Sequence, residues 1–289
     1  MDPQLKVRKS NVLVDGRYRF NLNEQKVLLL VLSRIKPCDV EFIPYKIPWA
    51  EIKKATNGKI NTAKKIHAVC ESLKNKTVII RQGKKELGFG FLSGWTVEQG
   101  KYVEFRLDPG MKDMLLDLLE NGNFTLYHLE CILSLNSSYA IRIYEIFKSH
   151  SWKKQPIEID LDNLKFALDI TKNSKTYSDF GSFRRAVLDK AQKDLKDHTD
   201  ICFTYKTVKD GRRIAALLVT IKDNKKYQHT IQGQAGLASA KNELKPGDII
   251  VIAGKEYEFN GSHIMLHDGA MPIGPLRQLI QQGKAKVRK

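Results

Sequence analysis

Two stretches of the sequence carry polar side chains that could contact bases and phosphates from one face of a helix. In residues 61–75, an apolar stripe recurs at the spacing of an α-helix and consists of Ile66, Val69, Cys70 and Leu73. The other face offers hydrogen-bond donors to base edges or phosphates, namely Asn61, Lys64 and His67, with Lys65 on the flank. We expect this face to bind DNA, and the alternative is an ordinary solvated helix face.

The second stretch is residues 182–196. Its apolar stripe consists of Phe183, Val187, Leu188, Ala191 and Leu195, and the polar side chains opposite are Ser182, Arg185, Asp189, Lys193 and Lys196. Arg185 could bind guanine O6 and N7 bidentately, a discrimination of about 1–3 kcal/mol. Arg184 falls at an angle within the apolar stripe, so we expect it to overhang the core and reach a phosphate, while Asp189 would orient Arg185 or contact cytosine. A helix with charges spaced four residues apart is the alternative.

Each helix is followed by a turn with basic residues at its tip. Lys84 and Lys85 lie in the turn 82–86, and Arg212 and Arg213 lie in the turn 209–213. Such tips suit a hairpin that lies along a neighbouring groove, although basic loop tips are also common on soluble proteins.

The residues of known catalytic motifs are not arranged here as catalysis would require. The sequence has no two histidines separated by one hydrophobic residue, no GxxxxGK[ST] phosphate loop and no Gx[SC]xG elbow. His263 and His267 are four residues apart, but in an expected strand and turn rather than on a helix, where that spacing suits a metal. We therefore expect no catalytic residues, no metal and no cofactor.

The elements around the first stretch follow the order of a winged helix-turn-helix. A buried helix should begin at Asn21 or Asn23, a short strand should cover residues 42–47, and Pro48 is placed to open a second helix. Asn57-Gly58 ends that helix before the stretch 61–75 begins. Extended segments with turns at Gly83 and Gly100 come next, and then a helix over residues 110–119.

The same order of elements recurs about 120 residues later. A helix at 139–147, a strand at 156–159, a helix at 161–168, the long helix from residue 182 and a hairpin turned at residues 209–211 follow one another. The sequence therefore predicts an α+β protein of two tandem winged helix-turn-helix domains, 1–122 and 123–227, with a small C-terminal extension. In that extension, residues 228–289, we expect a linker, a strand pair turned at Gly254-Lys255, a helix at 276–282 and a basic tail of unknown role.

Composition indicates what kind of ligand the chain attracts. The 289 residues carry a net charge of +17, spread as +8 over residues 1–120, +6 over 121–227 and +3 over the rest, so both halves would attract a polyanion. No basic amphipathic helix with an aromatic face stands out, which favours nucleic acid over a membrane. The longest apolar run, Val27 to Leu32, is too short to span a bilayer, and we expect a cytoplasmic protein with reduced, mostly buried cysteines.

Two strings of residues resemble a known family. VRKSNVLVDGRYRFNLNEQKVLLLVLSRI and YSDFGSFRRAVLDKAQKDLKDHTDICFTYKTVKDGRR are similar to segments of iteron-binding plasmid replication initiators. The resemblance covers about residues 5–225. It implies two winged-helix domains related by a pseudo-two-fold axis, a monomer that binds repeated origin DNA, origin melting, and recruitment of host replication proteins such as a helicase or initiator. It also implies a monomer–dimer equilibrium, in which dimers formed through the first domain repress the chain's own gene and take part in plasmid copy control.

Two other functions stay open at this point. A winged-helix transcription regulator would bind a lone operator, whereas an initiator would bind tandem direct repeats beside an AT-rich stretch. A nicking initiator enzyme would cut supercoiled origin DNA with Mg²⁺. In either binding mode, we expect each domain to place one helix in a major groove, on one face of the duplex, about one helical turn apart.

Overall fold

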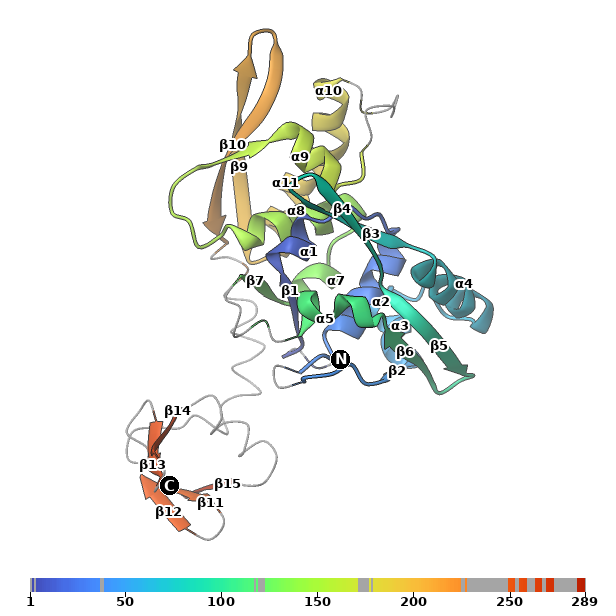
Figure 1. The fold of residues 1–289 in the computed structure, drawn as a ribbon, viewed down its shortest axis with the longest axis vertical. Coiled ribbons are helices and arrows are strands. Elements are labelled where there is room, and N and C mark those ends of the chain that lie inside the picture. The colour runs from blue at the N-terminus through green and yellow to red at the C-terminus, as the bar shows by residue number, and fades with distance from the viewer. Residues whose placement is uncertain are drawn as a thin grey trace. The chain divides into compact units, whose positions relative to one another are not determined.

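The structure is a computed structural model, which describes residues 2, 4–36, 39–116, 118, 123–170, 177, 179–224 and 227, and five strands between residues 249 and 288. The chain forms two compact units, residues 1–229 and residues 230–289 (Figure 1). Each unit is described below by itself.

The first winged helix is built from three helices and a three-stranded sheet. Helix α2 (Leu22–Leu32) begins at Asn21, whose side chain accepts hydrogen bonds from the backbone N–H groups of Asn23 and Glu24, while the Glu24 carboxylate accepts one from the Asn21 N–H. Helix α3 (Trp49–Ala55) follows Pro48, and helix α4 (Ala63–Lys74) follows a turn in which Asn57 and Gly58 both have positive φ. The sheet order is β2 (Tyr45–Pro48), β6 (Tyr102–Leu107) and β5 (Leu92–Glu98).

A second hairpin follows α4 directly in the chain and precedes β5. It is the hairpin that the sequence favours as the wing. Strands β3 (Thr77–Gln82) and β4 (Lys85–Gly90) pair only with each other among the described strands, with an isolated bridge from Ile79 to Arg17. The hairpin that belongs to the three-stranded sheet is β5–β6, which turns between Glu98 and Lys101. The turn 82–86 is therefore not the wing of the first sheet. The reason is that β2 pairs with β6, far along the chain, rather than with the hairpin that follows α4 directly.

The second winged helix repeats this order. Helix α8 (Ser138–Ser149) is capped by Ser137, strand β8 (Ile157–Asp160) precedes helix α9 (Leu161–Ala167), and a long helix follows. That helix comprises α10 (Phe180–Phe183), η3 (Arg184–Leu188) and α11 (Asp189–His198). Strands β9 (Ile201–Asp210) and β10 (Arg213–Asp223) complete a sheet of order β8-β10-β9. Because β8-β10-β9 matches β2-β6-β5 in order and in its helices, the predicted tandem fold is confirmed.

A two-stranded sheet and a buried charge network join the start of the chain to residues 124–145. Strand β1 (Lys6–Ser10) pairs antiparallel with β7 (Phe124–His128). The chain that connects these two strands also contains three short helices, α1 (Asn11–Asp15), η1 (Pro109–Met111) and α5 (Lys112–Leu115). Helix α7 (Leu129–Leu133) leads on to α8. Lys9 of β1 and Glu145 of α8 form an ion pair that is 1% and 0% exposed. The boundary expected between residues 122 and 123 stays a prediction.

The C-terminal unit contains a strand pair where the sequence predicts one. Strand β11 (Ile249–Ile252) lies between β12 (Lys255–Glu258) and β15 (Ala285–Arg288), and β13 (His263–Leu266) pairs with β14 (Gly269–Pro272). The basic tail thus contributes a strand. His267 and the helix expected at 276–282 lie outside the described residues.

Candidate nucleic-acid interface

Helix α4 presents the polar face that its spacing predicts. Ile66, Val69, Cys70 and Leu73 are buried, whereas Asn61, Lys64, Lys65 and His67 are exposed. The Thr62 side chain caps the helix by accepting a hydrogen bond from the Lys65 N–H. Lys65 Nζ donates to the Lys59 carbonyl at 2.9 Å and to Asn61 Oδ1 at 3.3 Å. The loop and the first turn of the helix therefore hold the Asn61 and Lys65 side chains next to each other.

His67 is positioned by an aromatic contact that the sequence did not predict. Its ring lies edge-on to Trp95 of β5, with 5.1 Å between the ring centroids. The contact joins α4 to the three-stranded sheet, so the exposed imidazole is held against a large aromatic side chain rather than free on a solvated surface.

The long helix of the second winged helix contains a wide turn at its two arginines. Asp179 caps the helix through the Ser182 N–H at 2.8 Å, and the Asp189 N–H donates to the Arg184 carbonyl, five residues back. Such a π-turn inserts one residue into the helical repeat and often marks a functional site. A helical wheel at 100° per residue places Arg184 in the apolar stripe, but the structure leaves its side chain 51% exposed.

The π-turn also decides which arginine Asp189 contacts. Asp189 Oδ2 lies 3.8 Å from Arg184 Nε, and Asp189 Oδ1 accepts a hydrogen bond from the Tyr205 hydroxyl at 3.2 Å. Arg185 lies instead 3.5 Å from Ser182 Oγ. The interpretation that Asp189 orients Arg185 is thus wrong for the unbound protein, in which Asp189 accompanies Arg184. Partial burial, and then the Asp189 charge, raise the pKa of Tyr205 to about 12, so its hydroxyl stays a donor.

The other predicted contacts on this helix face outward as expected. Lys193 and Lys196 are exposed on α11, and Ser182 is half-buried near the start of the helix. The apolar stripe is buried in full, from Phe183 through Val187, Leu188 and Ala191 to Leu195. Arg185, Lys193 and Lys196 are therefore exposed on one face of the helix, and the opposite face is packed against the core.

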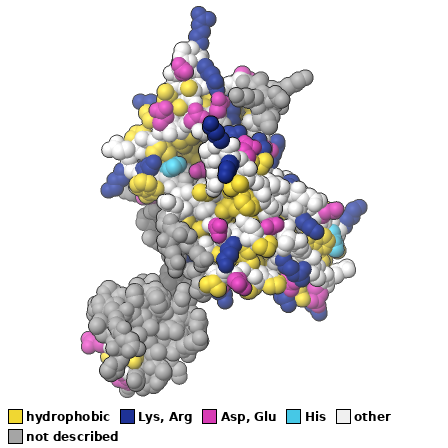
Figure 2. Space-filling view, viewed as in Figure 1, with side chains coloured by type: hydrophobic (Ala, Val, Ile, Leu, Met, Phe, Trp, Pro, Cys, Tyr) yellow, Lys and Arg dark blue, Asp and Glu magenta, His cyan; other side chains and the backbone are white. Residues whose placement is uncertain are grey.

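The basic turns occupy different places in the two winged helices. Arg212 and Arg213 lie at the tip of β9–β10, the long hairpin at one end of the unit, where Figure 2 shows Lys or Arg side chains projecting among acidic and hydrophobic ones. Arg213 Nη2 lies 2.5 Å from Asp162 Oδ2 of α9. Lys84 and Lys85 are exposed on β3–β4, outside the three-stranded sheet.

The residue at the corresponding tip of the first sheet is Lys101, which the sequence did not suggest. Its Nζ lies 2.6 Å from Glu98 Oε1, and both side chains are exposed. The turn at Gly100 is visible in the sequence, but which hairpin forms the wing depends on strand pairing across more than fifty residues.

Among the described residues there is no helix able to cross a membrane and no group of three His, Cys, Asp or Glu able to hold a metal ion. Cys70, Cys131 and Cys202 are free thiols, and burial raises the pKa of Cys70 and of Cys131 to about 12. Cys38 lies outside the described residues.

Known proteins match both winged helices. The family described as "Initiator Replication protein, WH1" matches residues 6–148, and "Initiator Rep protein, WH2" matches residues 160–221. A replication initiation protein of Escherichia coli is 27% identical over 281 residues, which cover 92% of this chain and 84% of that protein. The PI protein of Escherichia coli is 31% identical over 128 residues, or 40% of this chain and 42% of that protein.

One solved structure has the same fold. The crystal structure of Pi initiator protein in complex with iteron DNA superposes with a TM-score of 0.63 at 20% sequence identity, covering 76% of this chain and 98% of that one. At this identity the match supports the fold of two winged helices, and the roles of individual side chains must come from their own geometry.

Proposed function

This chain belongs to the initiator replication protein family, and we propose that it initiates plasmid replication by binding repeated double-stranded origin DNA, the iterons, through both winged helices. The observation that carries the proposal is the pair of equivalent helices, α4 and α10–α11, each with one face buried and one face of donors. A helix of this kind, after a strand and a helix in the same order, is the element that enters a major groove.

The predicted side chains divide into two roles. Arg185 has the fork of donors that matches guanine O6 and N7, and its hydrogen bond to the Ser182 hydroxyl is long at 3.5 Å, so the guanidinium can turn to a base. Lysines such as Lys64, Lys193 and Lys196 are point charges suited to phosphates. The net charge of +17 supplies the attraction that brings the duplex to both winged helices before specific contacts form.

Repeated sites are the proposal's second element. The Pi initiator was crystallised with iteron DNA, and the present chain shares its fold over most of its length. We propose further that bound copies promote opening of an adjacent AT-rich stretch and recruit host replication proteins, such as a helicase or an initiator. Dimers formed through the first domain would repress the chain's own gene. We also propose that the domains comprise residues 1–122, 123–227 and 228–289. The thirteen residues predicted from the sequence as DNA contacts are proposed to bind the duplex.

Opening without cleavage tests the initiator role against the two rival functions. Supercoiled plasmid carrying the DNA that flanks this chain's gene is incubated with the protein and Mg²⁺, and unpaired thymines are detected with permanganate. We expect reactive thymines in an AT-rich stretch next to the bound repeats, and no nicked circles. Nicked circles that form in proportion to the protein would make it an enzyme. Binding to one operator with no reactive thymines would favour a transcription regulator.

A further inference from the structure

A basic cleft lies where the first winged helix meets α9, α10 and the start of β10 of the second. Its volume is about 800 Å³, and its lining includes five basic side chains, Arg17, Arg81, Lys165, Arg212 and Arg213, against two acidic ones, Asp162 and Asp169. Only Arg212 and Arg213 are predicted from the sequence as DNA contacts. The other three basic residues have no role in the interface described so far.

Phe166 of α9 holds two arginines of the first winged helix at one side of this cleft. The Arg81 guanidinium carbon lies 3.5 Å from the centre of the Phe166 ring, and that of Arg17 lies 5.1 Å from it. A guanidinium that stacks on a ring keeps its N–H donors along its edge, where they can bind an anion. Bringing two like charges to one ring raises their mutual repulsion, which a bound anion would relieve.

The acidic neighbours only partly neutralise these arginines. Arg17 Nε lies 3.9 Å from Asp169 Oδ1, at the limit of an ion pair, and Arg81 Nε lies 3.0 Å from Glu86 Oε1, with both side chains half exposed. Exposed pairs of this kind contribute about 0–1 kcal/mol and exchange readily for a stronger anion. A phosphate could therefore bind to both guanidinium groups at little cost.

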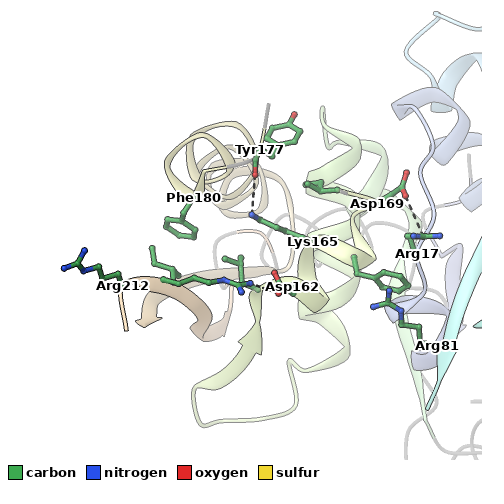
Figure 3. A pocket seen from close by; sticks show the side chains of 13 residues that line it. Arg17, Arg81, Asp162, Lys165, Asp169, Tyr177, Phe180 and Arg212 are labelled. Atoms are coloured by element: carbon green, nitrogen blue, oxygen red, sulfur yellow. Dashed lines mark hydrogen bonds and ion pairs between the residues drawn. The ribbon is translucent and has the colours of Figure 1, made fainter. Parts of the chain in front are cut away.

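The second winged helix continues the line of positive charge. Figure 3 shows the labelled Arg212 at one end, Lys165 in the middle, and Arg17 and Arg81 at the other end. Lys165 Nζ lies 3.4 Å from the Tyr177 carbonyl, and Arg213 lies against Asp162. A row of cations that spans both winged helices suits an extended polyanion better than one compact anion.

We propose that this cleft binds the sugar–phosphate backbone of the duplex between the two major grooves, with Arg17 and Arg81 as its contacts from the first winged helix. The proposal rests on the proposed function. When two recognition helices occupy neighbouring major grooves on one face, the backbone between them must face the junction of the two winged helices. Contacts there would fix the position of the protein on DNA without reading sequence. Because both winged helices line the cleft, the contact also requires their present arrangement.

The test replaces single DNA phosphates by uncharged groups and, separately, replaces the two arginines by uncharged side chains. One set of duplexes contains the site that the protein protects in footprinting, with a single methylphosphonate placed at each successive position. The variant is Arg17→Gln/Arg81→Gln. We expect methylphosphonates between the two protected grooves to weaken binding by the unchanged protein and to have little effect on the double variant. The slope of log affinity against log salt should fall by about 0.9 for each phosphate that the variant no longer neutralises, equally on specific and random duplexes.

Two controls separate a direct contact from a structural one. Lys222→Gln removes an exposed charge at the end of β10 opposite Arg213, about 30 Å away along the strand, and should leave the positional pattern unchanged. Arg81→Lys keeps the charge without the flat stacking plane and should retain the salt slope. If the double variant does not fold, the methylphosphonate pattern of the unchanged protein still decides the matter.

Three results would overturn the inference. The first is an unchanged salt slope in the folded double variant, and the second is a pattern with no sensitive phosphate between the grooves. The third is binding of ATP at this cleft without any weakening of DNA binding, since the volume also suits a nucleotide. If no sequence is protected at all, the proposed function fails, whereas the salt slope on random duplex still tests the cleft.

Discussion

Lys9 and Glu145 lie 136 positions apart in the chain, and their side chains meet in the interior with 2.6 Å between Nζ and Oε1. Arg142 Nη1 donates to the other carboxylate oxygen at 2.9 Å, and the Tyr18 and Tyr127 hydroxyls bond to the same carboxylate. The network joins β1, near the start of the chain, to α8, the helix that precedes β8 and α9. Its integrity should therefore decide whether the two recognition helices keep one arrangement.

Removing one charge from this network should destabilise the protein strongly. Lys9→Met leaves the fully buried Glu145 with one cation fewer, and breaking a buried pair in this way costs about 3–5 kcal/mol. Lys6→Met, an exposed position on the same strand, should change the free energy of unfolding by less than about 0.5 kcal/mol. Urea denaturation measures both. Equal effects of the two substitutions would mean that the buried pair contributes nothing.

Acid should weaken the same network. Burial raises the pKa of Glu145, but the charges of Lys9 and Arg142, with hydrogen bonds from Lys9 and Tyr127, outweigh burial and bring the pKa to about 2, from an ordinary 4.5. A depressed carboxyl pKa stabilises the fold fully above about pH 4.5, and this contribution disappears as the pH falls towards 2. The decrease amounts to about 3 kcal/mol.

Urea denaturation across that pH range tests this dependence. Glu145→Gln should be less stable at neutral pH and should lack the part of the acid dependence that Glu145 contributes, while Glu158→Gln, at an exposed position on β8, should keep it. An unaltered acid dependence in Glu145→Gln would assign the effect to other carboxylates.

Arg185 and Arg184 should differ in what they contribute to binding. Arg185→Ala should reduce discrimination at one base pair by about 1–3 kcal/mol, because alanine cannot bind guanine bidentately. Arg184→Ala should weaken specific and random duplexes alike, because its partner Asp189 and the π-turn hold it at the side of the helix, where it can reach a phosphate. Titration of single-base variants of the protected site measures both, with Lys222→Ala as the charge control. A uniform decrease for Arg185→Ala would make it a phosphate contact.

Local patterns predicted the helix faces well, and non-local pairing accounts for the errors. The stripe of Ile66, Val69, Cys70 and Leu73 could be read from spacing because a helix is set by neighbouring residues. The choice between two similar hairpins could not, since β2 selects β6 through contacts far along the chain. The π-turn at Arg184 could not be predicted either, because a wheel at 100° per residue assumes a regular helix.

The sequence and the structure indicate different hairpins as the wing of the first winged helix, and substitutions in each hairpin can decide between them. If β5–β6 acts as the wing, Lys101→Ala should lower the salt slope of binding by about 0.9, as expected for one phosphate. Lys84→Ala/Lys85→Ala tests the hairpin that the sequence favours. If the salt slope fell in the double variant but did not change in Lys101→Ala, β3–β4 would contact DNA in place of the wing, despite its position outside the sheet.

The most direct test of the central claim is hydroxyl-radical footprinting on the DNA that flanks this chain's gene. The proposed function predicts several direct repeats, and two winged helices in one compact unit predict that each repeat is protected in two stretches on one face of the duplex, about one helical turn apart. Protection of a single inverted site, or of one stretch per repeat, would contradict binding of repeated origin DNA through both winged helices.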